Sequence, residues 1–155
     1  MRTAMFALVL AACSSEVPAT SHVFDPCQPI DIAVIDATDA QQQSVGDALA
    51  RWRARGVAAF QIGDGAGVQV VFTSGNPAVY GYYDEAAATV YVNAELADPA
   101  ARAVTIAHEL GHALGLAHVP ADQRASVMNP GNLTIDPTDA DVAAIRARWG
   151  ACPAP

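Results

Sequence analysis

The chain has 155 residues, of which 52% are hydrophobic and 15% charged, a balance typical of a single globular domain rather than a disordered chain. Its eight basic residues are all arginines and stand against sixteen acidic ones, for a net charge of -8. Because phosphate binding requires a basic surface, this charge argues against nucleic acid as a partner.

The first predicted element is an export signal. Arg2 precedes an apolar run from Ala4 to Ala12, which is too short to span a bilayer as a helix. The run ends in Leu-Ala-Ala-Cys, with the cysteine at position 13. This ending resembles the bacterial lipobox, in which the cysteine is acylated and becomes the first residue of the mature protein. The alternative is an ordinary signal peptide with a cysteine at its cleavage site.

The lipobox reading divides the chain into three parts. We expect a signal peptide over residues 1–12, a lipidated tether over residues 13–27 that begins at Cys13, and a folded domain over residues 28–155. The protein would then be exported and held on a membrane of the bacterial cell envelope by its N-terminal lipid, facing the periplasm or the exterior. We expect it to be a monomer.

Two further cysteines lie at the two ends of the predicted domain. In an exported, oxidising setting the expected state of Cys27 and Cys152 is a disulfide. Closing a loop of this length stabilises a domain by about 4–5 kcal/mol in the chain-entropy model. The alternative is that Cys27 ligates an active-site metal and keeps the protein latent, although its surroundings, Asp-Pro-Cys-Gln-Pro, match no latency motif known to us.

The first two thirds of the domain predict strands around one helix. Thr38 is a suitable N-cap for a helix that runs to about Arg55. Residues 63–67 are rich in glycine but lack the Lys-Ser/Thr of a P-loop, so we expect a hairpin turn there. The predicted strands cover residues 30–35, 57–62, 68–72, 78–83 and 89–93.

A second helix begins at Asp98 and Pro99, an N-cap acid followed by proline at the first helical position. It carries residues 108–118, His-Glu-Leu-Gly-His-Ala-Leu-Gly-Leu-Ala-His, which hold three of the four histidines. His108 and His112 are four residues apart, so both lie on one face of the helix and can direct ring nitrogens at one ion.

The residues after the second histidine complete a predicted zinc site. Gly115 allows the chain to leave the helix in a conformation that other residues resist, and the turn brings His118 round as a third ligand. Three neutral nitrogen ligands leave a fourth position for water, as in catalytic rather than structural zinc sites. Glu109, next to the first histidine, is placed to take a proton from that water.

Residues 108–118 resemble the zinc signature of the metzincin metalloproteases, and the flanking residues are most similar to the matrixin branch. Ser-Val-Met-Asn-Pro at residues 126–130 is similar to the Met-turn that lies beneath the zinc in that clan. Residues 138–150 are similar to the last matrixin helix. The likeness is strong over about residues 99–150 and only architectural over residues 28–93.

The resemblance implies an α+β fold with an α/β-like upper subdomain, in which a twisted, mixed and mostly parallel five-stranded sheet packs with two long helices. A small C-terminal subdomain would hold the Met-turn and the final helix. It also implies a zinc endopeptidase that cleaves proteins or peptides, with one catalytic Zn²⁺, Glu109 as general base and Met128 as a hydrophobic floor. An edge strand from residues 78–93 would pair with the substrate, and residues 129–135 would line the specificity pocket.

The chain also departs from the matrixin pattern. Matrixins carry a segment rich in histidine and aspartate before the active-site helix, which binds a structural zinc and calcium. Residues 72–93 contain no histidine, so we expect no second zinc, and no propeptide with a switch cysteine is recognisable. Asp136, Asp139 and Asp141 could bind Ca²⁺, but helix capping explains these acids better, and calcium is not predicted.

Two other function classes compete with the enzyme. The first is a non-catalytic surface lipoprotein that binds zinc or a protein without cleaving it; the intact Glu109 counts against this alternative. The second is a structural domain that zinc only rigidifies, which a fourth protein ligand would favour. The sequence shows no such ligand.

Overall fold

The computed structural model describes residues 21–65 and 67–152. The predicted signal peptide, residues 1–12, and the predicted lipid site, Cys13, lie outside the described residues.

A five-stranded sheet organises the domain, with strand order β2-β1-β3-β5-β4. Four strands are parallel, and the edge strand β4 is antiparallel to its neighbour β5. This is the mixed, mostly parallel sheet that the metzincin resemblance predicts. The strands are β1 (Ile30–Ile35), β2 (Phe60–Ile62), β3 (Val68–Thr73), β4 (Gly81–Asp84) and β5 (Thr89–Asn93).

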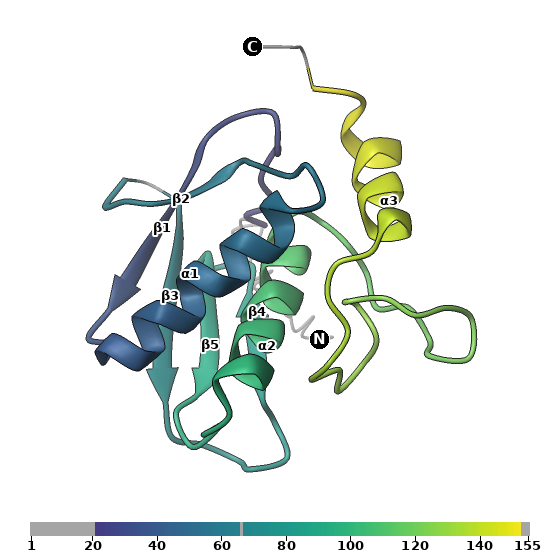
Figure 1. The fold of residues 1–155 in the computed structure, drawn as a ribbon. Helices are drawn as coiled ribbons and strands as arrows, with labels where there is room; N and C mark the ends of the chain where they lie inside the picture. The colour runs from purple at the N-terminus through teal and green to yellow at the C-terminus, as the bar shows by residue number, and fades with distance from the viewer. Residues whose placement is uncertain (1–20, 66, 153–155) are drawn as a thin grey trace, which may run out of the picture.

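Two long helices, α1 (Asp39–Arg53) and α2 (Pro99–Ala113), lie side by side against one face of the sheet (Figure 1). Between helices and sheet lies an apolar core in which Ile32, Val70 and Val90 come from the strands and Trp52 from α1. The Trp52 ring is fully buried and its Nε1–H donates to the Ala107 carbonyl of α2 at 3.0 Å. This bond satisfies the polar edge of the indole and holds the two helices together.

Local capping chemistry explains where α1 begins. The Thr38 hydroxyl accepts from the Gln41 N–H, and the Gln41 side chain accepts from the Thr38 N–H, which is a capping box. The predicted N-cap at Thr38 is therefore confirmed. The helix ends at Arg53, two residues before the predicted end, and Gly56 follows with a left-handed φ of 81°.

Two strands are displaced from their predicted bounds because hydrogen bonds hold the preceding residues in turns. Val57 still donates to the Trp52 carbonyl at 3.1 Å, so β2 starts only at Phe60. Before β4, the N–H of Val79 donates to the Asn76 carbonyl at 2.9 Å. Because of this turn the strand begins at Gly81 and not at the predicted residue 78.

The predicted hairpin at residues 63–67 is wrong. Strands β2 and β3 do not pair with each other; both run parallel to β1 and flank it on opposite sides. The connection must therefore cross β1 closely, and it does so at Asp31, near the start of that strand. A Cβ atom at Gly67 would lie 2.0 Å from the Asp31 carbonyl oxygen, which explains the need for glycine at this crossing.

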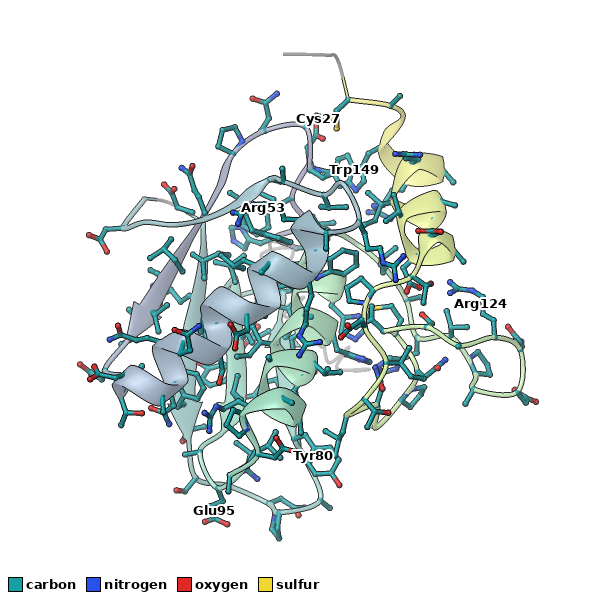
Figure 2. All side chains as sticks on the ribbon, in the orientation of Figure 1. Cys27, Arg53, Tyr80, Glu95, Arg124 and Trp149 are labelled. Atoms are coloured by element: carbon teal, nitrogen blue, oxygen red, sulfur yellow. A yellow bond between two sulfur atoms is a disulfide. The ribbon has the colours of Figure 1, made fainter. Side chains whose placement is uncertain are left out.

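The third helix, α3 (Asp139–Trp149), lies beside the two-helix layer rather than on the sheet (Figure 1). It is joined to α2 by Trp149, whose Nε1–H donates to the Leu114 carbonyl at 2.9 Å. Cys27 and Cys152 form the predicted disulfide, with Cα atoms 5.0 Å apart, and Cys27 lies near the end of α3 in Figure 2. Because Cys27 is bonded in this way, the alternative that it ligates the metal is wrong.

Residues 21–27, which fall within the predicted tether, are bound to the domain. The N–H of His22 donates to the Glu85 carbonyl at 2.9 Å, and the N–H of Phe24 donates to the Ala113 carbonyl at 2.8 Å. The domain described by the structure thus begins before residue 28. None of the helices in residues 21–65 and 67–152 is long and apolar enough to cross a membrane.

Candidate metal centre

Three imidazole rings converge at the end of α2, as their spacing predicts. The Nε2 atom of His118 lies 3.1 Å from Nε2 of His108 and 3.2 Å from Nε2 of His112. Ligand atoms of all three lie within 4.8 Å of one another, the only such cluster of histidine, cysteine or acidic groups in the described part of the chain.

Backbone carbonyls orient two of these rings. Nδ1 of His108 lies 2.7 Å from the Val127 carbonyl oxygen, and Nδ1 of His112 lies 2.8 Å from the Leu116 carbonyl oxygen. A carbonyl oxygen only accepts, so each Nδ1 carries the proton and donates. The Nε2 atoms of both rings therefore present lone pairs to the centre of the cluster.

These lone pairs require a positive group between them. Nε2 of His118 carries at most one proton, so it satisfies at most one of its two contacts, whereas a cation in the centre satisfies all three rings. A tetrahedral zinc ion with Zn–N bonds of about 2.0–2.1 Å holds its nitrogen ligands about 3.3 Å apart, close to the observed 3.1 and 3.2 Å. Burial lowers the pKa of His108 to about 4 and also lowers the pKa of His112, which favours the neutral, ligating form. The donor set fits zinc.

Gly115 makes the turn that brings in the third ring. Its φ of 82° is left-handed, its N–H donates to the His112 carbonyl at 2.8 Å, and the next N–H, of Leu116, donates to the Gly111 carbonyl at 2.9 Å. A Cβ atom at Gly115 would lie 2.5 Å from Arg148 Nε. Glycine is thus required here by both conformation and space.

Glu109 lies beside the cluster in a cleft of about 210 Å³. The cleft runs between the start of β4 and residues 130–132, and Thr105, His108 and His118 also line it. Glu109 as a whole is only 6% exposed. Burial raises the pKa of its carboxyl group to about 7.

Met128 lies fully buried in the turn over residues 126–130. A Cβ atom at Gly111 of α2 would lie 2.4 Å from its sulfur, so the methionine packs directly against the helix that carries the histidines. Asn129 ties the turn to its surroundings, since its side-chain amide donates to the Val119 carbonyl at 2.8 Å. Met128 is thus part of the apolar core that packs against α2.

The sequence did not reveal how the last helix supports this turn. Asp141 is fully buried and accepts from the Val127 N–H at 3.1 Å, from the Ser126 hydroxyl and from Arg124 Nη1 at 2.8 Å. It also completes the capping box with Thr138, which is the role that the sequence predicts. The capping pattern was the only local signal of Asp141, because its other partners lie 14–17 residues away.

The other two acids considered for calcium pair with arginines. Asp136 forms an ion pair with Arg51, and Asp139 forms one with Arg55 at 3.2 Å. Arg51 lies in the last turn of α1 and Arg55 just after the helix, so these contacts join this end of α1 to the segment before α3 and to its first residue.

Comparison with solved structures finds the same fold in a hatching enzyme zinc-protease and in myroilysin. High choriolytic enzyme 1, a hatching enzyme zinc-protease from the medaka fish Oryzias latipes, is 12% identical, with a TM-score of 0.56 over 86% of this chain and 95% of its own. One structure of myroilysin is 20% identical, with a TM-score of 0.50 over 64% of this chain. A second is 17% identical, with a TM-score of 0.50 over 86% of this chain and 67% of its own.

The chain spans about half the length of the first myroilysin structure, 53%. No family model matches the chain, and a search of curated proteins finds no match. At these identities the structural likeness establishes the fold and not the activity. The chain has a metzincin-type fold, with its three converging histidines at the end of the second helix.

Proposed function

We propose that the protein is a zinc-dependent endopeptidase that hydrolyses peptide bonds of proteins or peptides. One observation carries the proposal: three Nε2 atoms converge next to a buried carboxyl group, inside a cleft that runs along the open edge of a sheet. His108, His112 and His118 would hold the ion, which leaves the side facing the cleft for water and substrate. The medaka hatching enzyme of the same fold is a zinc-protease by its name.

When bound, zinc acts as a Lewis acid that polarises the scissile carbonyl and acidifies water. Glu109 would take a proton from the attacking water as its oxygen bonds to the carbonyl carbon. The same carboxyl group would return the proton to the amine as the C–N bond breaks. The buried carboxyl group lines the same cleft as His108 and His118, so it lies within reach of water and substrate in that cleft.

We also propose the matrixin branch and an exported lipoprotein, on sequence grounds. The residues that support the branch are the turn at 126–130 and the final helix. The Leu-Ala-Ala-Cys run that ends at Cys13 supports the lipid anchor on the cell envelope, and a disulfide between Cys27 and Cys152 fits an oxidising compartment. Because His22 and Phe24 are hydrogen-bonded to the domain, we propose a tether that ends before residue 21.

The test compares the wild-type chain with Glu109→Gln and, as a matched control, with Glu95→Gln. Glu95, labelled in Figure 2, precedes the first residue of α2, whereas His108 and His112 lie near the last. We expect about one zinc per chain in all three proteins by elemental analysis. Cleavage of casein should be abolished by a chelator and at least about 100-fold slower in Glu109→Gln only.

Two outcomes would contradict the proposal. If none of the proteins cleaves casein or a broad peptide panel while zinc is bound, the site is a metal-binding scaffold without catalysis. If Glu109→Gln cleaves as fast as Glu95→Gln, a group other than Glu109 activates the water.

A further inference from the structure

We propose that an apolar groove on the outer face of the sheet binds an apolar or aromatic side chain of the extended peptide substrate. The groove lies behind the edge strand β4, on the opposite side from the three histidines. This inference rests on the proposed function, because it assumes that an extended peptide lies along β4.

The groove is built mainly from apolar surface. Tyr82 and Val79 are unusually exposed for their size, at 50% and 43%, and the Tyr82 ring stacks on Tyr91 with ring centroids 4.8 Å apart. Thr73 and Asn76 close the groove from the neighbouring strand and its loop. No helix covers this face among the described residues, since α1 and α2 both pack on the other face (Figure 1).

The groove and the metal cleft meet at the same two residues. Val79 and Gly81 line both, one from each side of the chain as it enters β4. A peptide that lies along this part of β4 therefore borders both cavities at once.

The register of β4 shows which of its own peptide groups point to the open edge, where a substrate peptide would pair. The Asn93 N–H donates to the Tyr80 carbonyl at 2.8 Å, and Tyr82 lies opposite Tyr91. In an antiparallel ladder hydrogen-bonded pairs alternate, so the peptide groups of Tyr80 and Tyr82 face β5 while those of Gly81 and Tyr83 face the open edge. A Cβ atom at Gly81 would lie 3.4 Å from Glu109 Cγ, which places the start of this edge beside the proposed base.

The far end of this edge is already occupied. The N–H of His22 donates to the Glu85 carbonyl at 2.9 Å, and the Tyr83 hydroxyl donates to the His22 carbonyl at 2.6 Å. An added peptide is thereby restricted to pairing with Gly81 and Tyr83.

Strand geometry then decides where each substrate side chain points. Residues that lie opposite one another in a sheet share a face, and successive residues alternate between faces. The substrate residues opposite Gly81 and Tyr83 face α2 and the metal. The residue between them, opposite Tyr82, faces outward and lies against the Tyr82 ring and the groove.

The chemistry of the groove selects what it binds. Stacked aromatic rings and a valine favour an apolar or aromatic side chain. Asp84 lies on the same face as Tyr82, two residues along β4, and the chain carries a net charge of -8, so an acidic side chain is disfavoured. The preference applies to one substrate position, next to the one that enters the metal cleft.

The experiment measures binding separately from cleavage. Zinc-loaded Glu109→Gln chain is titrated into fluorescein-labelled alanine-rich peptides that carry one phenylalanine at successive positions. We expect two favoured positions next to each other, one for each cavity, each tightening binding by about 10-fold. Tyr82→Ser should abolish only one of the two preferences, Tyr82→Phe should keep both, and Ile62→Ser on the opposite edge of the sheet should change neither.

A second variant, Val79→Thr, carries the test if Tyr82→Ser does not fold, as judged by circular dichroism. The inference is overturned if neither variant weakens the preference at either position, or if only one position shows a preference. If the wild-type chain cleaves peptides but Tyr82→Ser leaves both binding preferences unchanged, the proposed function stands and the proposed role of the groove is rejected. If peptide binding depends on Tyr82 but the wild-type chain cleaves nothing, the groove binds peptide and the proposed endopeptidase function is rejected.

Discussion

The carboxylate of Asp141, in α3, accepts a hydrogen bond from the backbone N–H of Val127 at 3.1 Å. The carbonyl of that same Val127 lies 2.7 Å from Nδ1 of His108. The last helix of the domain is therefore joined to the first proposed ligand through a single residue of the methionine turn. Arg124, at the base of the loop beside α3 (Figure 2), donates from Nη1 to the other carboxylate oxygen of Asp141 at 2.8 Å.

We expect Asp141→Ala to lower the free energy of unfolding by about 3–5 kcal/mol, because it leaves the partners of a buried charge unsatisfied. Zinc affinity should fall about 10- to 100-fold as the support of His108 is lost. Denaturant unfolding and competition with a zinc chelator measure the two effects. The control is Asp139→Ala, whose exposed pair with Arg55 contributes less than about 1 kcal/mol. An unchanged zinc affinity in Asp141→Ala would show that the turn holds His108 without this helix.

The same carboxylate predicts how stability depends on pH. Burial alone would raise the pKa of Asp141, but hydrogen bonds from Ser126, Arg124 and Thr138 outweigh it and lower the pKa below its usual value. A group with a lowered pKa in the folded state stabilises the fold above the pKa of the unfolded state, and this stability is lost as pH falls. We expect wild type to lose stability below about pH 4 and Asp141→Ala to lose less over the same range, both measured on chelated protein by thermal unfolding. Parallel curves for the two proteins would contradict this.

The disulfide should contribute a large part of the stability. It closes a loop with a sequence separation of 125 residues, for which the chain-entropy model gives about 4–5 kcal/mol. We expect the double variant Cys27→Ser, Cys152→Ser to unfold at a correspondingly lower denaturant concentration, with its zinc content unchanged in the folded state. If the free energy of unfolding of the double variant falls by less than about 1 kcal/mol, the hydrogen bonds of residues 21–24 already hold the N-terminal segment in place.

Gly115→Ala tests the turn that presents His118. A left-handed conformation costs alanine about 1–2 kcal/mol. At this position its Cβ would also collide with Arg148 and Val23. We expect a larger loss of stability than in Gly56→Ala, which has a similar φ of 81° but open space around it. Zinc per chain, measured by elemental analysis, should fall in Gly115→Ala alone. Equal losses in both variants would show that the crowding is relieved without moving His118.

Much of the fold could be predicted because its signals are local. Strands β1 and β5 have the predicted bounds, and the starts of all three helices follow from caps at Thr38, Asp98 and Thr138. The convergence of the three histidines was predictable for the same reason, since four residues of helix and one glycine turn set it. These features depend on residues within about one turn of each other.

The errors and omissions concern contacts between residues far apart in sequence. The glycine-rich segment was interpreted as a hairpin because its composition shows a tight turn but not which strands lie on either side of it. Asp141 was recognised as a cap, whereas its bonds to Ser126, Val127 and Arg124 depend on how α3 packs. Tyr82 and Val79 carried no signal at all, because a groove exists only where separate strands and loops meet.

The sequence by itself thus determined the three histidines and the glutamate, the caps of the helices and the pair of cysteines, since spacing along a helix and residue chemistry are properties of short segments. Only the tertiary structure decided which strand of residues 78–93 is the open edge beside Glu109, that α3 supports His108 through Val127, and that an apolar groove lies behind the edge strand. Packing of an apolar core brings such groups together from distant parts of the chain, and no short segment records that arrangement.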